Sequence, residues 1–197
     1  MPADPAELRR SLNEIALHQA GYFTAAQARR VGYSYQAQKH HVDRGNWTRV
    51  DRGLFRIPGW PARGEDALVR WRLWSGDRAV VSHESALTLH DLSDANPARL
   101  HLTVPPRFPR RDSALVLHQA SLPSEDVEGR EGYRITTVER TLLDVAAGGI
   151  TQEQLDSAVS EAIDRGLVSA RRLRSRADAF GDRAALLLER ALGAAGR

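Results

Sequence analysis

The sequence predicts an α/β (α+β) chain of two domains, and three observations support this. Up to residue 45, three stretches place apolar residues at three-to-four spacing, each opened by a helix-capping residue. Two short runs rich in β-branched and aromatic residues follow, before the segment PGWPARG. Beyond that segment, predicted helices and strands intermingle, and only helices follow the last strand. Residues 1–60 therefore predict a winged helix-turn-helix, and residues 61–197 a small mixed α/β domain with a helical tail.

The N-terminal elements follow in the order that this fold requires. Helices are predicted over residues 5–19, 24–32 and 34–45. Asp4, Thr24 and Ser34 are the expected N-caps, because their side-chain oxygens accept backbone N–H groups of the first turn. Only about three residues connect the second and third helices, as in a helix-turn-helix. The runs NWTRV and GLFRI, joined across Asp51, Arg52 and Gly53, predict a hairpin wing.

The second domain mixes both kinds of element. Strands are predicted over residues 100–104, 114–117 and 134–136. Helices are predicted over residues 65–76, 82–92, 137–149, 151–166, 169–180 and 182–195. Between the first two strands, PPRFPRRD is expected to form a basic, proline-rich turn. Arg140 and Asp144 lie one turn apart on a helix and are expected to form an internal ion pair.

Composition narrows the environment. The chain has no cysteine, which excludes disulfides and thiolate metal sites. It contains no run of eighteen apolar residues, so no membrane span is expected. The first twenty residues lack the basic-then-apolar pattern of a signal peptide. We therefore expect a cytoplasmic protein.

Positive charge is concentrated at the N-terminus. The net charge is +3, yet residues 1–63 hold ten Lys or Arg against five Asp or Glu. The remaining residues hold eighteen basic side chains against twenty acidic ones. This asymmetry predicts a polyanion-binding head on a nearly neutral body.

The third helix and the hairpin supply suitable side chains for DNA. Helical spacing turns Ala37, Gln38, His41 and Val42 inward and Tyr35, Gln36, Lys39, His40 and Asp43 outward. Gln can bind adenine through two hydrogen bonds, and Lys can reach guanine acceptors. The hairpin arginines suit phosphate contact, which gives affinity with little sequence preference. A solvated polar face beside an ordinary hairpin is the alternative interpretation.

No catalytic, cofactor or metal site is predicted. His83, His90, His101 and His118 could in principle surround zinc, but SHESALTLH lacks the HExxH spacing, and ordinary hydrogen-bonded histidines are the favoured interpretation. A magnesium nuclease would group acidic residues with a lysine, using candidates such as Glu84, Asp91 and Asp144. The only lysine is Lys39, in the proposed reading helix, which argues against that type of nuclease.

Four motifs occur in a familiar order. They are the wing RGLFR, the helix SHESALTLH, the strand HLTVP and the helix TVERTLLD. Together, over about residues 20–147, they resemble the AbiEi-like antitoxins of type IV toxin–antitoxin systems. The resemblance implies an N-terminal winged helix that represses its own operon at inverted repeats, with two copies paired side by side on DNA. It also implies a C-terminal domain that counteracts a nucleotidyltransferase-like toxin.

The resemblance places the reading helix at residues 34–44 and the wing at residues 47–57. Two inward positions that are usually aliphatic in relatives are Gln38 and His41 here, so either the helix is rotated and exposes Gln38 to bases, or its packing is unusually polar. The expected DNA-binding residues are Ser34, Tyr35, Gln36, Gln38, Lys39, His40, Arg44, Arg49, Arg52 and Arg56.

Two other functions remain open. The chain could be an interaction module that neutralises a toxin by direct contact and binds no specific DNA. It could also be an ordinary repressor with a small-molecule pocket in the second domain, although no pocket motif supports this.

Overall fold

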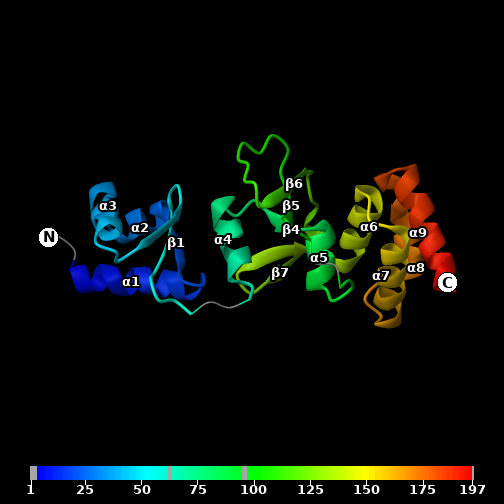
Figure 1. Cartoon of the computed structure of the whole chain (residues 1–197), viewed down its shortest axis with the longest axis horizontal. Helices are drawn as coiled ribbons and strands as arrows, with labels where there is room; N and C mark the ends of the chain where they lie inside the picture. The colour runs from blue at the N-terminus through cyan, green and yellow to red at the C-terminus, as the bar shows by residue number, and fades with distance from the viewer. Residues whose placement is uncertain (1–3, 62–63, 95–96, 197) are drawn as a thin grey trace. The chain divides into compact units, whose positions relative to one another are not determined.

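The computed structural model describes residues 4–61, 64–94 and 97–196. The chain forms two compact units (Figure 1). Unit 1 comprises Met1–Arg78 with Glu131–Tyr133, and unit 2 comprises Ala79–Arg130 with Arg134–Arg197. Unit 1 thus continues past the Pro- and Gly-rich segment and includes one further helix. The fold is α/β, with an N-terminal helix-turn-helix and a C-terminal α/β unit.

The helices of unit 1 begin where their capping residues predict. They are α1 (Pro5–Leu17), α2 (Ala25–Val31), α3 (Tyr35–Asp43) and α4 (Asp66–Trp74). The side chains of Asp4, Thr24 and Ser34 accept backbone N–H groups of the first turns of α1, α2 and α3. At α2 the cap is reciprocal, because the Gln27 side chain accepts the Thr24 N–H. All three predicted N-caps are confirmed.

A small antiparallel sheet completes unit 1. Its strands are β1 (Tyr22–Thr24), β2 (Thr48–Asp51) and β3 (Leu54–Arg56), in the order β1-β3-β2. The hairpin β2–β3 is the predicted wing, whereas β1 was not predicted. The register shifts between Arg49 and Asp51, which gives β2 a bulge close to the hairpin tip. The core beneath the sheet is built from Leu12, Ala16, Phe23, Ala28, Tyr33, Trp47 and Phe55.

The turn into β1 depends on a glycine. Gly21 has a φ of +81°, and a Cβ at this position would lie 2.5 Å from the Trp60 ring. Any larger residue would therefore meet both an unfavourable backbone conformation and a steric clash.

Unit 2 is organised around a mixed sheet. Its strands are β4 (Val80–Val81), β5 (Leu100–Val104), β6 (Leu115–Gln119), β7 (Val127–Arg130) and β8 (Tyr133–Thr136), in the order β6-β5-β4-β8-β7. The sequence predicted β5, β6 and β8 but missed the short strands β4 and β7. Strands β5 and β6 are parallel, with Leu100 opposite Leu115 and Val104 opposite Gln119. The segment between them is therefore a crossover, and it contains a turn at residues 106–107.

Helices cover this sheet and extend beyond it. They are α5 (His83–Leu89), α6 (Val138–Gly148), α7 (Gln152–Asp164), α8 (Ala170–Ala177) and α9 (Asp182–Ala194), and all five were predicted. Helix α6 packs against α5, and α9 packs against α6, α7 and α8 (Figure 1). The apolar faces of these helices form one core that includes Leu87, Leu142, Leu155, Leu173 and Leu188. Within the described residues, no helix is long and apolar enough to span a bilayer.

Candidate nucleic-acid interface

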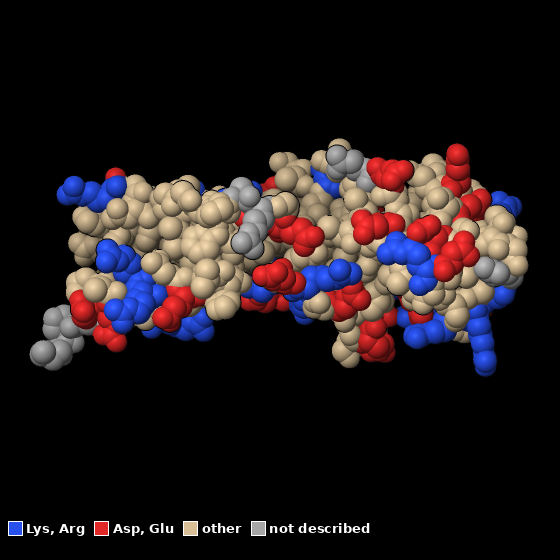
Figure 2. Space-filling model, turned by 90° about the horizontal axis from the view of Figure 1, so that it is seen from below, with Lys and Arg blue, Asp and Glu red and all other residues tan. Residues whose placement is uncertain are grey.

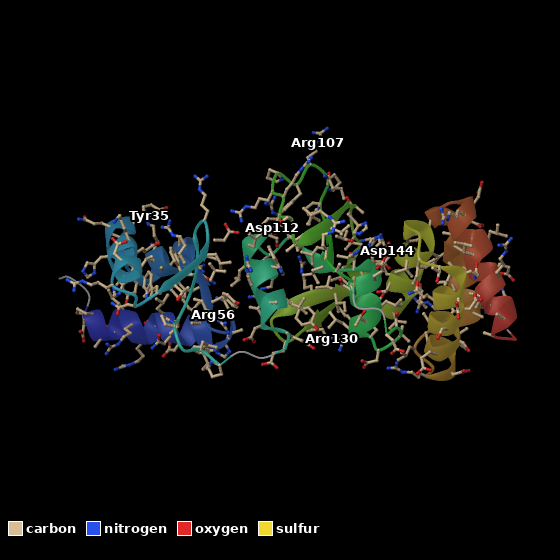
Figure 3. All side chains as sticks on the ribbon, in the orientation of Figure 1. Tyr35, Arg56, Arg107, Asp112, Arg130 and Asp144 are labelled. Atoms are coloured by element: carbon tan, nitrogen blue, oxygen red, sulfur yellow. The ribbon has the colours of Figure 1, made fainter. Side chains whose placement is uncertain are left out.

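The outer face of α3 carries exposed polar side chains. Tyr35, Gln36, Lys39 and His40 are exposed, and their spacing places them on one side of the helix. Tyr35 is 64% exposed and lies on the outside of α3 (Figure 3). Lys39 pairs with Asp43 at 2.6 Å, but both side chains are largely exposed. Such a surface pair contributes little, so the ammonium group can exchange Asp43 for a phosphate or a base.

Gln38 lies inside the unit. It is 3% exposed, and its Nε2 donates to the carbonyl oxygens of Tyr33 at 3.1 Å and Ala25 at 3.2 Å. The side-chain amide thus links α3 to the start of α2 and to the turn before α3. This placement does not fit the expectation that Gln38 contacts bases, because the amide already has buried partners. Of the two alternatives for this helix, the observed one is polar packing.

His41 also packs inward. Its ring stacks on Trp47 with centroids 4.7 Å apart and planes 14° apart, and Asn46 Nδ2 lies 3.3 Å from its Nδ1. Burial, with a further contribution from the charge of His40, lowers the pKa of His41. Burial and the neighbouring charge thus disfavour the protonated ring, which packs in the aromatic core behind the outer face of α3.

The wing presents two exposed arginines. Arg49 lies on β2, where its guanidinium carbon is 5.9 Å from the centroid of the Phe55 ring, and Arg52 lies at the hairpin tip. Gly53 completes the tip with a φ of +72°. Arg44, which ends α3, is exposed as well. The three guanidinium groups are available for phosphate oxygens.

Arg56 has a different environment. Its Nη2 lies 2.8 Å from Asp66 Oδ2, its Nε donates to the Ala20 carbonyl at 3.2 Å, and its guanidinium covers the Tyr22 ring. The side chain is 22% exposed. These contacts connect the wing to α4 and to the turn before β1. Figure 3 labels Arg56. The geometry favours a structural role over phosphate contact.

Sequence reasoning did not single out Arg29. This residue lies in the last turn of α2, and its guanidinium carbon is 4.7 Å from the centroid of the Tyr35 ring. The contact can orient the exposed Tyr35 ring of α3. The only signal in the sequence was the pair Arg29–Arg30 just before the helix-turn-helix glycine, Gly32.

In unit 2, the TVERTLLD motif builds a buried ionic network. Arg140 donates to Asp144 Oδ1 at 2.8 Å and to Asp126 Oδ2 at 2.9 Å, which confirms the predicted Arg140–Asp144 pair. The Asp126 side chain is fully buried and also pairs with Arg176, which reaches Glu139. Burial raises the pKa of Asp144 to about 6, although Arg140 opposes the shift. The network joins α6, α8 and the segment before β7.

The four histidines separate into two groups. His90 Nε2 lies 2.8 Å from the Thr136 carbonyl oxygen. The rings of His83 and His118 stack with centroids 3.4 Å apart, and His118 Nε2 lies 3.2 Å from His101 Nδ1. Burial lowers the pKa of His83 to about 3 and that of His118 to about 4. In the part of the chain that the structure describes, no group of three or more His, Cys, Asp or Glu is arranged to hold a metal ion.

Comparisons with known proteins find one family match for each of the two units. Residues 10–58 match the family described as transcriptional regulator, AbiEi antitoxin, and residues 79–193 match the AbiEi antitoxin C-terminal domain. Among solved structures, the RV2827C protein from Mycobacterium tuberculosis is similar, with a TM-score of 0.67 and 15% identity. That match covers 100% of this chain and 80% of the other, and it shows a shared fold. No curated protein matches the sequence.

Proposed function

Because the chain belongs to the AbiEi antitoxin family of transcriptional regulators, we propose that unit 1 binds operator DNA and represses the chain's own operon. Unit 2 then counteracts a cognate nucleotidyltransferase-like toxin of a type IV system. In this proposal both units act by binding and neither catalyses a reaction. The observation that carries the DNA part is the combination of an exposed, polar α3 face with two exposed wing arginines.

The proposed roles differ between helix and wing. Gln36 and Lys39 on the outer face of α3 contact base edges, where a good bidentate pair contributes about 1–3 kcal/mol of discrimination. Arg44, Arg49 and Arg52 contact phosphates and set the affinity for any sequence. Pairing of two copies on an inverted repeat follows from the two-fold symmetry of such operators.

The test is a fluorescence-anisotropy titration at near-physiological salt. DNA from upstream of the gene is compared with scrambled DNA of the same length. A preference of about a thousandfold or more, the usual minimum for specific recognition, supports a regulator. Equal and weak binding to both DNAs contradicts the proposal and favours an antitoxin that acts by direct contact alone.

The wing is tested by its salt dependence. Arg49→Ala combined with Arg52→Ala should weaken binding to both DNAs and lower the slope of log K against log salt by about 0.9 per lost contact. The control, Arg171→Ala with Arg190→Ala, removes two exposed charges from unit 2. A loss confined to the upstream DNA would contradict the phosphate role.

A further inference from the structure

The crossover between β5 and β6 is unusual for a parallel pair. Because Leu100 lies opposite Leu115 and Val104 opposite Gln119, the chain must travel back along the whole strand length before β6 begins. Parallel strands are normally joined by a dozen or more residues that include a helix. Here residues 105–114 make the connection, and they contain neither helix nor strand. We call residues 105–112 the basic strap.

Several contacts hold the basic strap in one conformation. Phe108 is 7% exposed and anchors the middle of the strap in its own domain. The Arg107 N–H donates to Gln119 Oε1 at 2.9 Å, and Asp112 Oδ1 accepts the Ala114 N–H at 2.9 Å. Three of its eight residues are prolines, which fix φ and reduce the freedom of the unfolded segment.

The strap also contains backbone strain. Arg107 has a φ of +61°, a backbone conformation that is unfavourable for a residue with a side chain. A glycine would remove this cost, yet the position carries an arginine. Strained positions of this kind concentrate at functional segments. In Figure 3 the Arg107 side chain points away from the sheet at the outer end of the strap.

The exposed charge of the strap is positive. Arg107, Arg110 and Arg111 are exposed, and the acidic residue of the strap, Asp112, caps the following turn. Three guanidinium groups thus lie within five residues on a pre-organised segment. Guanidinium groups bind phosphates or carboxylates through paired hydrogen bonds.

The apolar content of the strap favours phosphate over carboxylate partners. Protein interfaces use arginine together with aromatic anchors that become buried in the partner. The aromatic ring of the strap, Phe108, is already buried in its own domain. Phosphate contacts require only exposed donors in a fixed position. We propose that the basic strap is a second contact for the phosphate backbone of duplex DNA, additional to unit 1 and resting on the proposed operator binding.

The experiment uses the full chain with Arg107→Gln, Arg110→Gln and Arg111→Gln combined. Affinity for the upstream and scrambled DNAs is measured from 50 to 300 mM salt. If all three side chains contact phosphates, the slope of log K against log salt falls by about 2–3. Both DNAs lose affinity by a similar factor, so their ratio is unchanged. A second triple variant with lysine at the same positions keeps the charge and restores most of the slope.

The control variant carries Arg171→Gln, Arg183→Gln and Arg190→Gln, which remove the same charge from exposed sites on α8 and α9. The inference is overturned if the DNA affinity and salt slope of the glutamine strap variant differ from those of the wild type no more than the control's do. It is also overturned if the strap variant binds DNA normally but no longer protects cells from the toxin, because the strap would then contact protein. If the wild-type chain binds neither DNA, the proposed function fails first. Circular dichroism is used to check that all three triple variants are folded.

Discussion

Arg140→Ala should destabilise unit 2 while leaving unit 1 intact. The arginine side chain is 11% exposed and pairs with two carboxylates, Asp126 at 0% and Asp144 at 6% exposure. Asp126 keeps Arg176 in the variant, but Asp144 loses the cation that pairs with it. Removing one partner of a buried pair costs about 3–5 kcal/mol, because the other charge stays buried without compensation. We expect a loss of this size in the free energy of unfolding at pH 7.

The loss should depend on pH in a defined direction. The pKa of Asp144 is about 6 in the wild type, and without Arg140 it rises further. The variant carboxyl is therefore protonated at pH 5, where the penalty of a buried charge disappears. The difference between variant and wild type should be smaller at pH 5 than at pH 7. Adding Asp144→Asn to Arg140→Ala should recover part of the loss at pH 7.

The chain offers an internal control for this assay. All four tryptophans, Trp47, Trp60, Trp71 and Trp74, lie in unit 1. Urea unfolding followed by tryptophan fluorescence therefore reports unit 1, whereas far-UV circular dichroism also reports the helices of unit 2. Arg140→Ala should shift the dichroism transition and leave the fluorescence transition in place. A loss below about 1 kcal/mol, or an equal loss at both pH values, would refute the reasoning.

Three further predictions concern single residues. Gln38→Ala should lower the free energy of unfolding, followed by fluorescence, by about 1–3 kcal/mol, because one buried and one partly buried carbonyl lose a donor. The exposed Gln36→Ala should change it by no more than about 0.5 kcal/mol, and similar losses in the two variants would contradict the buried role of Gln38. Gly21→Ala should lower the free energy of unfolding more than Gly45→Ala. Gly45 has a comparable positive φ, but no atom lies within 4 Å of a Cβ added there. Equal fluorescence midpoints for the two variants would argue against the clash with the Trp60 ring. The pKa of His83 is lowered from 6.5 to about 3, so the folded state loses stability as pH falls from about 6.5 towards 3. Between these pH values, the melting temperature measured by dichroism should fall less for His83→Asn than for the wild type. Parallel curves of melting temperature against pH for the two proteins would exclude this histidine as the cause.

The helices could be predicted because their signals are local. The N-caps Asp4, Thr24 and Ser34 and the three-to-four spacing lie within each segment, and the structure confirms them. Strand β4 was missed because two residues cannot show alternation, and β7, with the sequence VEGR, because it has a single β-branched residue and a glycine. The parallel pairing of β5 with β6 was also out of reach, since it is decided by contacts between segments distant in sequence.

The outer face of α3 shows the same limit at the level of single residues. Helical spacing alone places Tyr35, Gln36, Lys39 and His40 outside, and all four are exposed. The same spacing turned Gln38 inward, but its polarity left exposure to bases as an alternative. The carbonyls that settle the matter come from other segments, one of them thirteen residues earlier. Sequence can therefore give the periodicity of a helix, whereas the partners of a polar side chain depend on the tertiary fold.

Arginine-rich segments show most clearly that the role of a side chain depends on the tertiary fold. Only one of the 28 basic residues is a lysine, so composition alone does not distinguish the arginines that bind a ligand from those that pair within the fold. Helix α8 carries RRLRSR and would pass for a nucleic-acid contact. Yet Arg172 and Arg176 pair with acids of unit 2, and Arg174 pairs with Glu189. Acidic and basic side chains accordingly lie beside one another over the C-terminal half in the view of Figure 2. In the basic strap, the three arginines lie exposed on a segment fixed by prolines and a buried aromatic ring. Substitution of Arg176, which pairs with the buried Asp126, should therefore alter stability, and substitutions in the strap should alter the salt dependence of DNA binding.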